Sequence, residues 1–109
     1  MSRQHDFHSV NIAGVNRKLP LVEVKPGLRI AILNILGDTE LVQAAASALD
    51  QKLAQVSYDV LVTAEAKSIP LICALALIAD KNYVVLRKEY KPYMGDVVSA
   101  ETLSITTGN

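Results

Sequence analysis

Residues 28–87 alternate apolar runs of strand length with stretches of helical spacing, and this order constrains the fold more than any other feature of the chain. The three apolar runs cover residues 28–34, 59–63 and 83–87. Between the first two, Gly37-Asp38-Thr39 supplies a turn and a helix N-cap, and apolar residues then recur at helical spacing to Val56. Before the third, Pro70 stands where a first helical turn tolerates it. The pattern predicts strand, helix, strand, helix, strand.

Strands that are apolar almost throughout are typical of a parallel sheet covered on both faces. We therefore predict that residues 28–87 form the βαβαβ half of a doubly wound, Rossmann-like α/β fold. Residues 71–79 have almost no polar face, so this helix should be largely buried. Residues 1–27 indicate short strands and turns, with His5 and His8 in a mobile N-terminal tail, and residues 97–107 alternate like an exposed antiparallel strand pair.

Composition limits the partners and the compartment. A chain of 109 residues allows one domain, and 11 basic against 11 acidic residues give no reason to expect nucleic acid or an anionic membrane as a partner. The single Cys73 cannot form an internal disulfide or a cysteine metal cluster, so we expect a core thiol in a reducing cytoplasm. The polar start lacks a signal-peptide pattern, and the longest apolar run is far shorter than the ~20 residues of a membrane helix.

Two loops of the predicted sheet carry candidate binding residues. In open α/β sheets, ligands bind beyond the carboxyl ends of the strands. Residues 63–70 leave one such end and contain Lys67 just before a helix start, where backbone N–H groups favour an anion. Residues 87–93 leave the next strand with Arg87, Lys88 and Lys91. If the two strands are neighbours, the loops face each other and predict a phosphate or pyrophosphate site.

Less specific interpretations of the same residues stay open. A cluster of Lys and Arg after a strand is usually a solvated turn. Glu65 and Lys67 could form an exposed ion pair of small energetic consequence. Tyr90 and Tyr93 flank the cations and could stack on a base, although packing is the commoner role of such residues.

Residues 58–71 (YDVLVTAEAKSIPL), followed by residues 83–91 (YVVLRKEYK), resemble the type I phosphoribosyltransferases, and most closely their adenine-using and related purine-salvage branch. Residues 12–20 and 34–38 are similar to the same branch. The resemblance implies an enzyme, acting as a homodimer with Mg²⁺. In this reaction a purine base, expected to be adenine, displaces pyrophosphate from phosphoribosyl pyrophosphate to give a nucleoside monophosphate.

The resemblance also implies roles for particular residues. Residues 1–27 would form a hood over the base, with Val15 and Arg17 as base contacts, and residues 28–109 would begin the α/β domain. Residues 93–107 would match a flexible loop that closes over the donor, and a non-proline cis peptide bond would fall at Ala66–Lys67. The pyrophosphate contacts would be Glu65, Ala66, Lys67, Ser68, Arg87, Lys88 and Lys91.

Two departures from the family pattern qualify these implications. Ser68 stands where close relatives carry Gly, which reaches unusual backbone conformations more easily. The acidic pair and the Thr/Gly-rich loop that hold ribose 5-phosphate in the family do not occur before Asn109. We therefore expect the 109 residues to be catalytically incomplete alone and to expose an apolar edge. The alternative is a non-catalytic module of the same fold that senses a purine or phosphoribosyl pyrophosphate.

Overall fold

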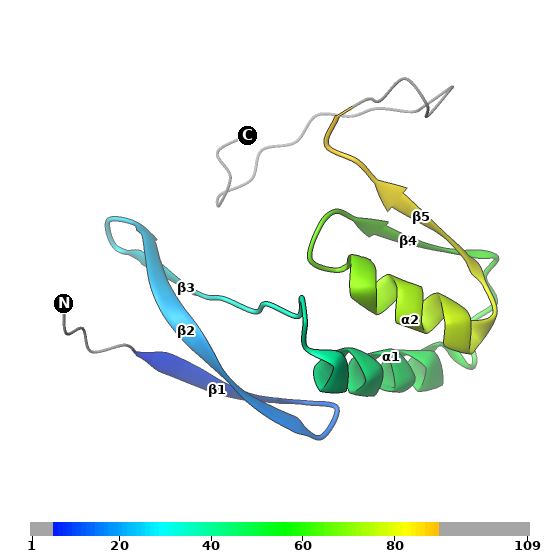
Figure 1. Ribbon diagram of the computed structural model, residues 1–109, viewed down its shortest axis with the longest axis horizontal. Coiled ribbons are helices and arrows are strands. Elements are labelled where there is room, and N and C mark those ends of the chain that lie inside the picture. Colours follow the sequence, from blue (N-terminus) through cyan, green and yellow to red (C-terminus); the bar gives the residue numbers. More distant parts are fainter. Residues whose placement is uncertain (1–5, 90–109) are drawn as a thin grey trace.

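A computed structural model describes residues 6–89 of the chain (Figure 1). The elements, in chain order, are β1 (Phe7–Ile12), β2 (Val15–Lys25), β3 (Leu28–Ala31), α1 (Thr39–Leu53), β4 (Val60–Ala64), α2 (Ile69–Ala79) and β5 (Asn82–Leu86). The first three strands form an antiparallel sheet in the order β1-β2-β3, and β4 and β5 pair in parallel as a second sheet. The chain is therefore a mixed α/β protein, as its sequence predicts.

β3 corrects the predicted sheet topology. We expected the apolar run at residues 28–34 to be the first strand of a parallel sheet, but Leu28–Ala31 pairs antiparallel with β2. The physical reason is the Pro26-Gly27 turn, in which Gly27 has a φ of 80°. A connection of two residues can only reverse the chain, whereas parallel strands need a long crossover. The predicted strand also ends earlier, at Ala31.

The N-terminal strands form a hairpin with a tight turn. Ala13 and Gly14 both have positive φ values, 53° and 88°, which suits the two-residue turns that match the twist of antiparallel strands. The hairpin pairs Ile12 with Val15 next to this turn, and Phe7 with Pro20 at its far end. His8 belongs to β1, so the prediction that it lies in a mobile tail is wrong. His5 lies outside the described residues.

Both helices begin where the sequence predicts. Asp38 is the N-cap of α1, and its carboxylate accepts a hydrogen bond from the Leu41 backbone N–H at 3.2 Å. Pro70 lies in the first turn of α2, where the missing N–H has no helical partner to lose. Asp80 ends α2 in the left-handed conformation, and Val56 lies beyond the end of α1. The predictions that α1 begins after Asp38 and that Pro70 lies in the first turn of α2 are therefore confirmed.

The core lies where α2 packs against α1 and against one face of β4 and β5 (Figure 1). Its buried side chains are Ala46, Leu61, Ile72, Leu75 and Ala76. The expected cover on both sheet faces is not found among residues 6–89, because the side chains of β4 and β5 that point away from α2 are exposed. These exposed side chains are Val60, Val62, Val84 and Leu86.

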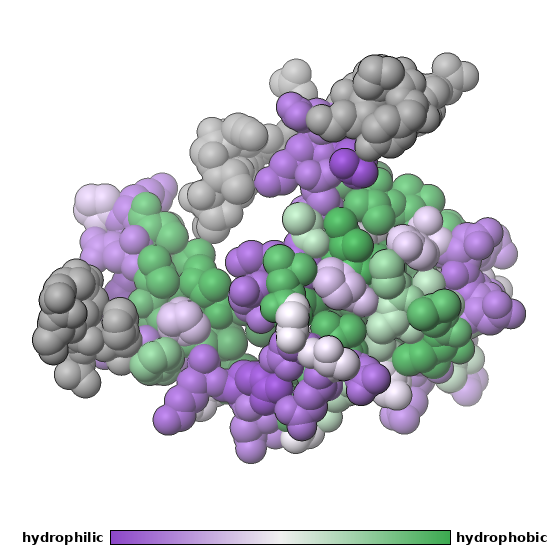
Figure 2. Space-filling model, in the orientation of Figure 1, coloured by the Kyte–Doolittle hydropathy of each residue, from purple (hydrophilic) through white to green (hydrophobic). Residues whose placement is uncertain are grey.

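α2 itself is only partly buried, which corrects the expectation of a largely buried helix. Leu75 is 5 % exposed, whereas its neighbour Leu77 is 84 % exposed. Cys73 is half-buried, and its thiol donates a hydrogen bond to the Tyr83 hydroxyl at 3.2 Å. Figure 2 shows hydrophobic residues on the surface of the molecule, both over the antiparallel sheet and over the part that holds α2 and β5.

No helix within residues 6–89 combines the length and the apolar character that a membrane span requires. The predicted strand pair at residues 97–107 and the predicted flexible loop at residues 93–107 lie outside the described residues.

Candidate anion-binding site

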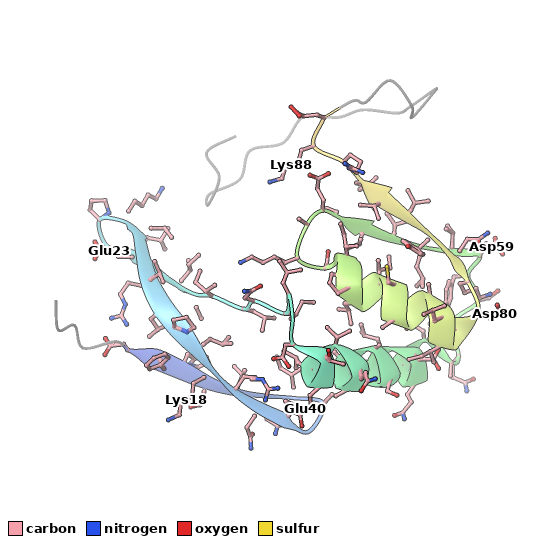
Figure 3. The ribbon with its side chains drawn as sticks, in the orientation of Figure 1. Lys18, Glu23, Glu40, Asp59, Asp80 and Lys88 are labelled. Carbon is pink, nitrogen blue, oxygen red and sulfur yellow. The ribbon has the colours of Figure 1, made fainter. Side chains whose placement is uncertain are left out.

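The parallel pairing of β4 with β5 brings the two predicted binding loops to one edge of the sheet. The register pairs Thr63 with Val85 and Ala64 with Leu86, so both strands end level with each other. The loop from β4 to α2 and the residues after β5 therefore leave the sheet side by side, as the sequence predicts. Figure 3 shows Lys88 next to this loop, whereas Asp59 and Asp80 lie at the opposite end of the strands.

Glu65 joins the two loops. Its Oε1 atom accepts a hydrogen bond from Arg87 Nε at 2.8 Å and from the Lys88 backbone N–H at 3.2 Å. Its own backbone N–H donates to the Leu86 carbonyl at 3.0 Å. Glu65 thus pairs with Arg87, not with Lys67 as the less specific interpretation of the sequence suggested. The sequence places Glu65 directly after β4 and Arg87 directly after β5. An assumption that the two strands are parallel neighbours would therefore have predicted this pair.

The loop backbone has an unusual peptide bond. The Glu65–Ala66 bond is cis although residue 66 is not proline. The resemblance implied a cis bond at Ala66–Lys67, so that expectation is wrong by one position. Ser68 has φ −83° and ψ −5°, a right-handed helical conformation open to any L residue. The Ser that replaces the family's Gly therefore needs no special backbone freedom here.

The Ser68 side chain fastens the loop to β4. Its Oγ donates to the Ala64 carbonyl at 2.8 Å and lies 2.6 Å from Thr63 Oγ1. Ser68 is the N-cap residue of α2, but its hydroxyl makes no capping bond to that helix. The Ile69 N–H already donates to the Ala66 carbonyl at 3.2 Å and Pro70 has no N–H, so only the Leu71 N–H of the first turn is left to meet an anion. Sequence reasoning named Ser68 but missed its pairing with Thr63.

The cations of this edge supply the rest of the positive charge. Lys67 and Lys88 are exposed, and the Arg87 side chain is 39 % exposed while it holds Glu65. Lys91, Tyr90 and Tyr93 lie outside the described residues. The arrangement combines the start of α2, one guanidinium and two ammonium groups with the Glu65 carboxylate, and such cations suit phosphate oxygens.

The predicted base contacts lie elsewhere. Val15 and Arg17 belong to β2, and the Arg17 guanidinium binds Asp38 in two bonds, Nε to Oδ2 at 2.8 Å and Nη2 to Oδ1 at 2.9 Å. Arg17 Nη2 also contacts Glu40 at 2.9 Å. These bonds fix β2 to the start of α1 and do not extend to the β4–α2 loop. An open groove of about 490 Å³ is lined by residues of both hairpin strands: Ser9, Val10, Asn11, Asn16, Arg17 and Lys18.

The described residues do not fit a protein-held Mg²⁺. Residues 6–89 contain no group of three or more His, Cys, Asp or Glu side chains that could hold a metal ion. Glu65, the carboxylate nearest the candidate site, is already bound by Arg87 and by the Lys88 backbone. A divalent cation prefers several oxygen ligands, and this edge of the sheet offers it mainly cations.

Comparison of the sequence with models of protein families and with curated proteins finds no match.

Proposed function

We propose that this chain provides the pyrophosphate-binding part of a purine phosphoribosyltransferase, with adenine as the base. One observation carries the proposal: the β4–α2 loop and the Arg87-Lys88 segment lie at one sheet edge, joined by the 2.8 Å contact between Glu65 and Arg87. Both segments lie within residues 58–71 and 83–91, the parts of the sequence that resemble the type I phosphoribosyltransferases. The proposal takes its reaction type from that resemblance and its site from this geometry.

The chemistry asked of these residues is stabilisation of a leaving group. When a base displaces pyrophosphate from the anomeric carbon of the ribose, negative charge builds up on the departing phosphate oxygens. Arg87, Lys88 and Lys67 lie where they can meet that charge, and the Leu71 N–H adds one backbone donor at the start of α2. The parallel pairing of β4 and β5 fixes the backbone positions from which these side chains extend, so the two segments are already side by side before the ligand arrives.

To test the proposal, the full 109-residue chain is titrated with pyrophosphate, and binding is measured by calorimetry or by phosphorus NMR. Arg87→Ala should raise the Kd for pyrophosphate about tenfold, because it removes a charge-assisted contact. Arg29→Ala is the matched control, since Arg29 is an exposed arginine of β3 whose partner is Asp6. An equal Kd for the wild-type chain and Arg87→Ala would overturn the proposed site.

A second measurement addresses turnover. The chain is incubated with phosphoribosyl pyrophosphate and each of several bases, and release of pyrophosphate is followed. Formation of a nucleoside monophosphate from adenine supports the transferase assignment. Binding of phosphoribosyl pyrophosphate without release would instead favour the sensing module of the same fold.

A further inference from the structure

Glu65 is an acidic residue in a site proposed to bind an anion, and its charge by itself would weaken that binding. Its side chain is 23 % exposed, and its Oε1 atom accepts hydrogen bonds from Arg87 Nε at 2.8 Å and from the Lys88 backbone N–H at 3.2 Å. Its backbone N–H donates to the Leu86 carbonyl at 3.0 Å. Glu65 is therefore bonded to each of the three successive residues that end β5 and follow it.

The bond to Glu65 leaves the outer donors of the Arg87 guanidinium for a ligand. A guanidinium is planar, so a bond at Nε restricts the plane in which Nη1 and Nη2 lie, and these two groups form a fork that matches a pair of phosphate oxygens. Arg17 is a contrast, because Asp38 takes its Nε and Nη2 donors and the Asn16 carbonyl takes Nη1. Glu65 takes only Nε of Arg87, so it orients the fork without occupying it.

The bond from the Lys88 N–H places the second cation. The paired register of β4 and β5 ends with Ala64 and Leu86, and the bond to Glu65 keeps the backbone beside the β4–α2 loop beyond that point. The backbone position determines where the Arg87 and Lys88 side chains begin. Donors that are already ordered bind a ligand more tightly, because less conformational entropy is lost on binding.

We infer that Glu65 is a positioning residue, whose carboxylate holds Arg87 and the Lys88 backbone so that the two cationic side chains meet pyrophosphate. The inference rests on the proposed function, because it assigns a role within the same site. It differs from the family resemblance, which implies that Glu65 itself contacts pyrophosphate. It also predicts an effect opposite in sign to that of charge, since loss of this acidic side chain should weaken the binding of an anion.

The experiment titrates four forms of the full chain with pyrophosphate at fixed ionic strength: wild type, Glu65→Ala, Glu65→Gln and Asp59→Ala. Glu65→Gln removes the charge but keeps a side-chain oxygen that can accept the same two hydrogen bonds. Asp59→Ala removes an equal charge at the opposite end of β4, where Asp59 is exposed (Figure 3). It controls for the general attraction of a more positive protein.

The two Glu65 variants should differ from each other. Glu65→Ala should raise the Kd for pyrophosphate about fivefold, because the ligand must then order Arg87 and Lys88 itself. Glu65→Gln should recover most of this loss, whereas Asp59→Ala should lower the Kd by less than about twofold, since its charge is distant and screened. A Kd for Glu65→Ala equal to or below that of wild type would overturn the inference, as would equal Kd values for the two Glu65 variants.

A double variant tests whether Glu65 acts through Arg87. Added to Arg87→Ala, Glu65→Ala should raise the Kd by less than about twofold, because the main group that Glu65 positions is already gone. A further rise as large as that caused by Glu65→Ala alone would show that Glu65 acts independently of Arg87 and would contradict the positioning role.

Failure of the inference and failure of the proposed function give different results. If Arg87→Ala weakens pyrophosphate binding and Glu65→Ala does not, the positioning role is overturned and the proposed site stands. If Arg87→Ala leaves pyrophosphate binding unchanged, the proposed site is overturned and the role of Glu65 with it. Circular dichroism checks that each variant keeps the fold, and Glu65→Met, which keeps the length of the side chain, replaces Glu65→Ala if that variant does not fold.

Discussion

At the scale of single residues, Asp38 holds two partners at once. Its carboxylate caps α1 through the Leu41 N–H and accepts two bonds from the Arg17 guanidinium. The bonds to Arg17, and secondly the bond to Leu41, lower the pKa of Asp38 from 3.8 to about 2. The cap was predictable from the Gly37-Asp38-Thr39 sequence. The partnership with Arg17 was not, because the hairpin that brings β2 to α1 is a tertiary arrangement.

This pKa predicts how acid affects the fold. Because the pKa of Asp38 is lower in the folded chain, its contribution to stability is complete above pH 3.8 and is lost as the pH falls through about 2. Arg17→Met should lower the melting temperature at about pH 5, and its difference from wild type should shrink as the pH approaches about 2. Melting curves followed by far-UV circular dichroism at several pH values would measure this difference.

Arg29→Met is the control for this prediction. Arg29 pairs with Asp6 on an exposed surface, where the two side chains are 47 % and 63 % exposed, and such pairs contribute little to stability. Its melting temperature should stay close to that of wild type across the same pH range. A difference between Arg17→Met and wild type that does not change with pH would contradict the role assigned to Asp38.

At the scale of elements, the starts of both helices and the strands β4 and β5 were predictable within about a residue, because caps, Pro70 and apolar runs are local signals. The end of α1 was not, since α1 ends at Leu53 although the apolar spacing continues to Val56. The strand β3 was predictable, but its antiparallel pairing was not, because the apolar run at residues 28–34 suits a parallel strand as well as an antiparallel one. The decisive signal was the Pro26-Gly27 turn, which forces reversal. The candidate site was likewise predictable only in part. Its cations could be named from the sequence, whereas the pairing of Glu65 with Arg87 depends on which strands are neighbours in the sheet.

α2 offers a matched pair of substitutions that tests its packing. Leu75 is 5 % exposed in the core and Leu77 is 84 % exposed on the same helix. Leu75→Ala should lower the free energy of unfolding by about 2–4 kcal/mol through lost burial and the cavity left behind. Leu77→Ala should change it by less than about 0.5 kcal/mol. Urea denaturation measures both, and equal losses would mean that Leu77 is covered in solution.

At the scale of the whole molecule, burial is uneven. The buried hydrophobic side chains of residues 6–89 all lie between Ile35 and Ala76, in α1, β4, α2 and the segment before α1. None of the described residues of β1, β2 or β3 is buried to that degree. The antiparallel sheet contacts the rest through α1, with Arg17 bound to Asp38 and Glu40 at the junction. The described part of the molecule therefore has one buried core, and the bonds of Arg17 to Asp38 and Glu40 link the antiparallel sheet to it.

This division predicts the pattern of amide hydrogen exchange. Amides open with local free energies that follow buried contacts, so those of α1, α2 and β4 should exchange more slowly than those of β1 and β3. Arg17→Ala should speed exchange in β1 and β2, because it releases the sheet from the start of α1, and should leave α2 unchanged. Hydrogen exchange followed by mass spectrometry resolves these segments. Equal acceleration in α2 would mean that the sheet and the core unfold as one unit, and that Arg17 stabilises both.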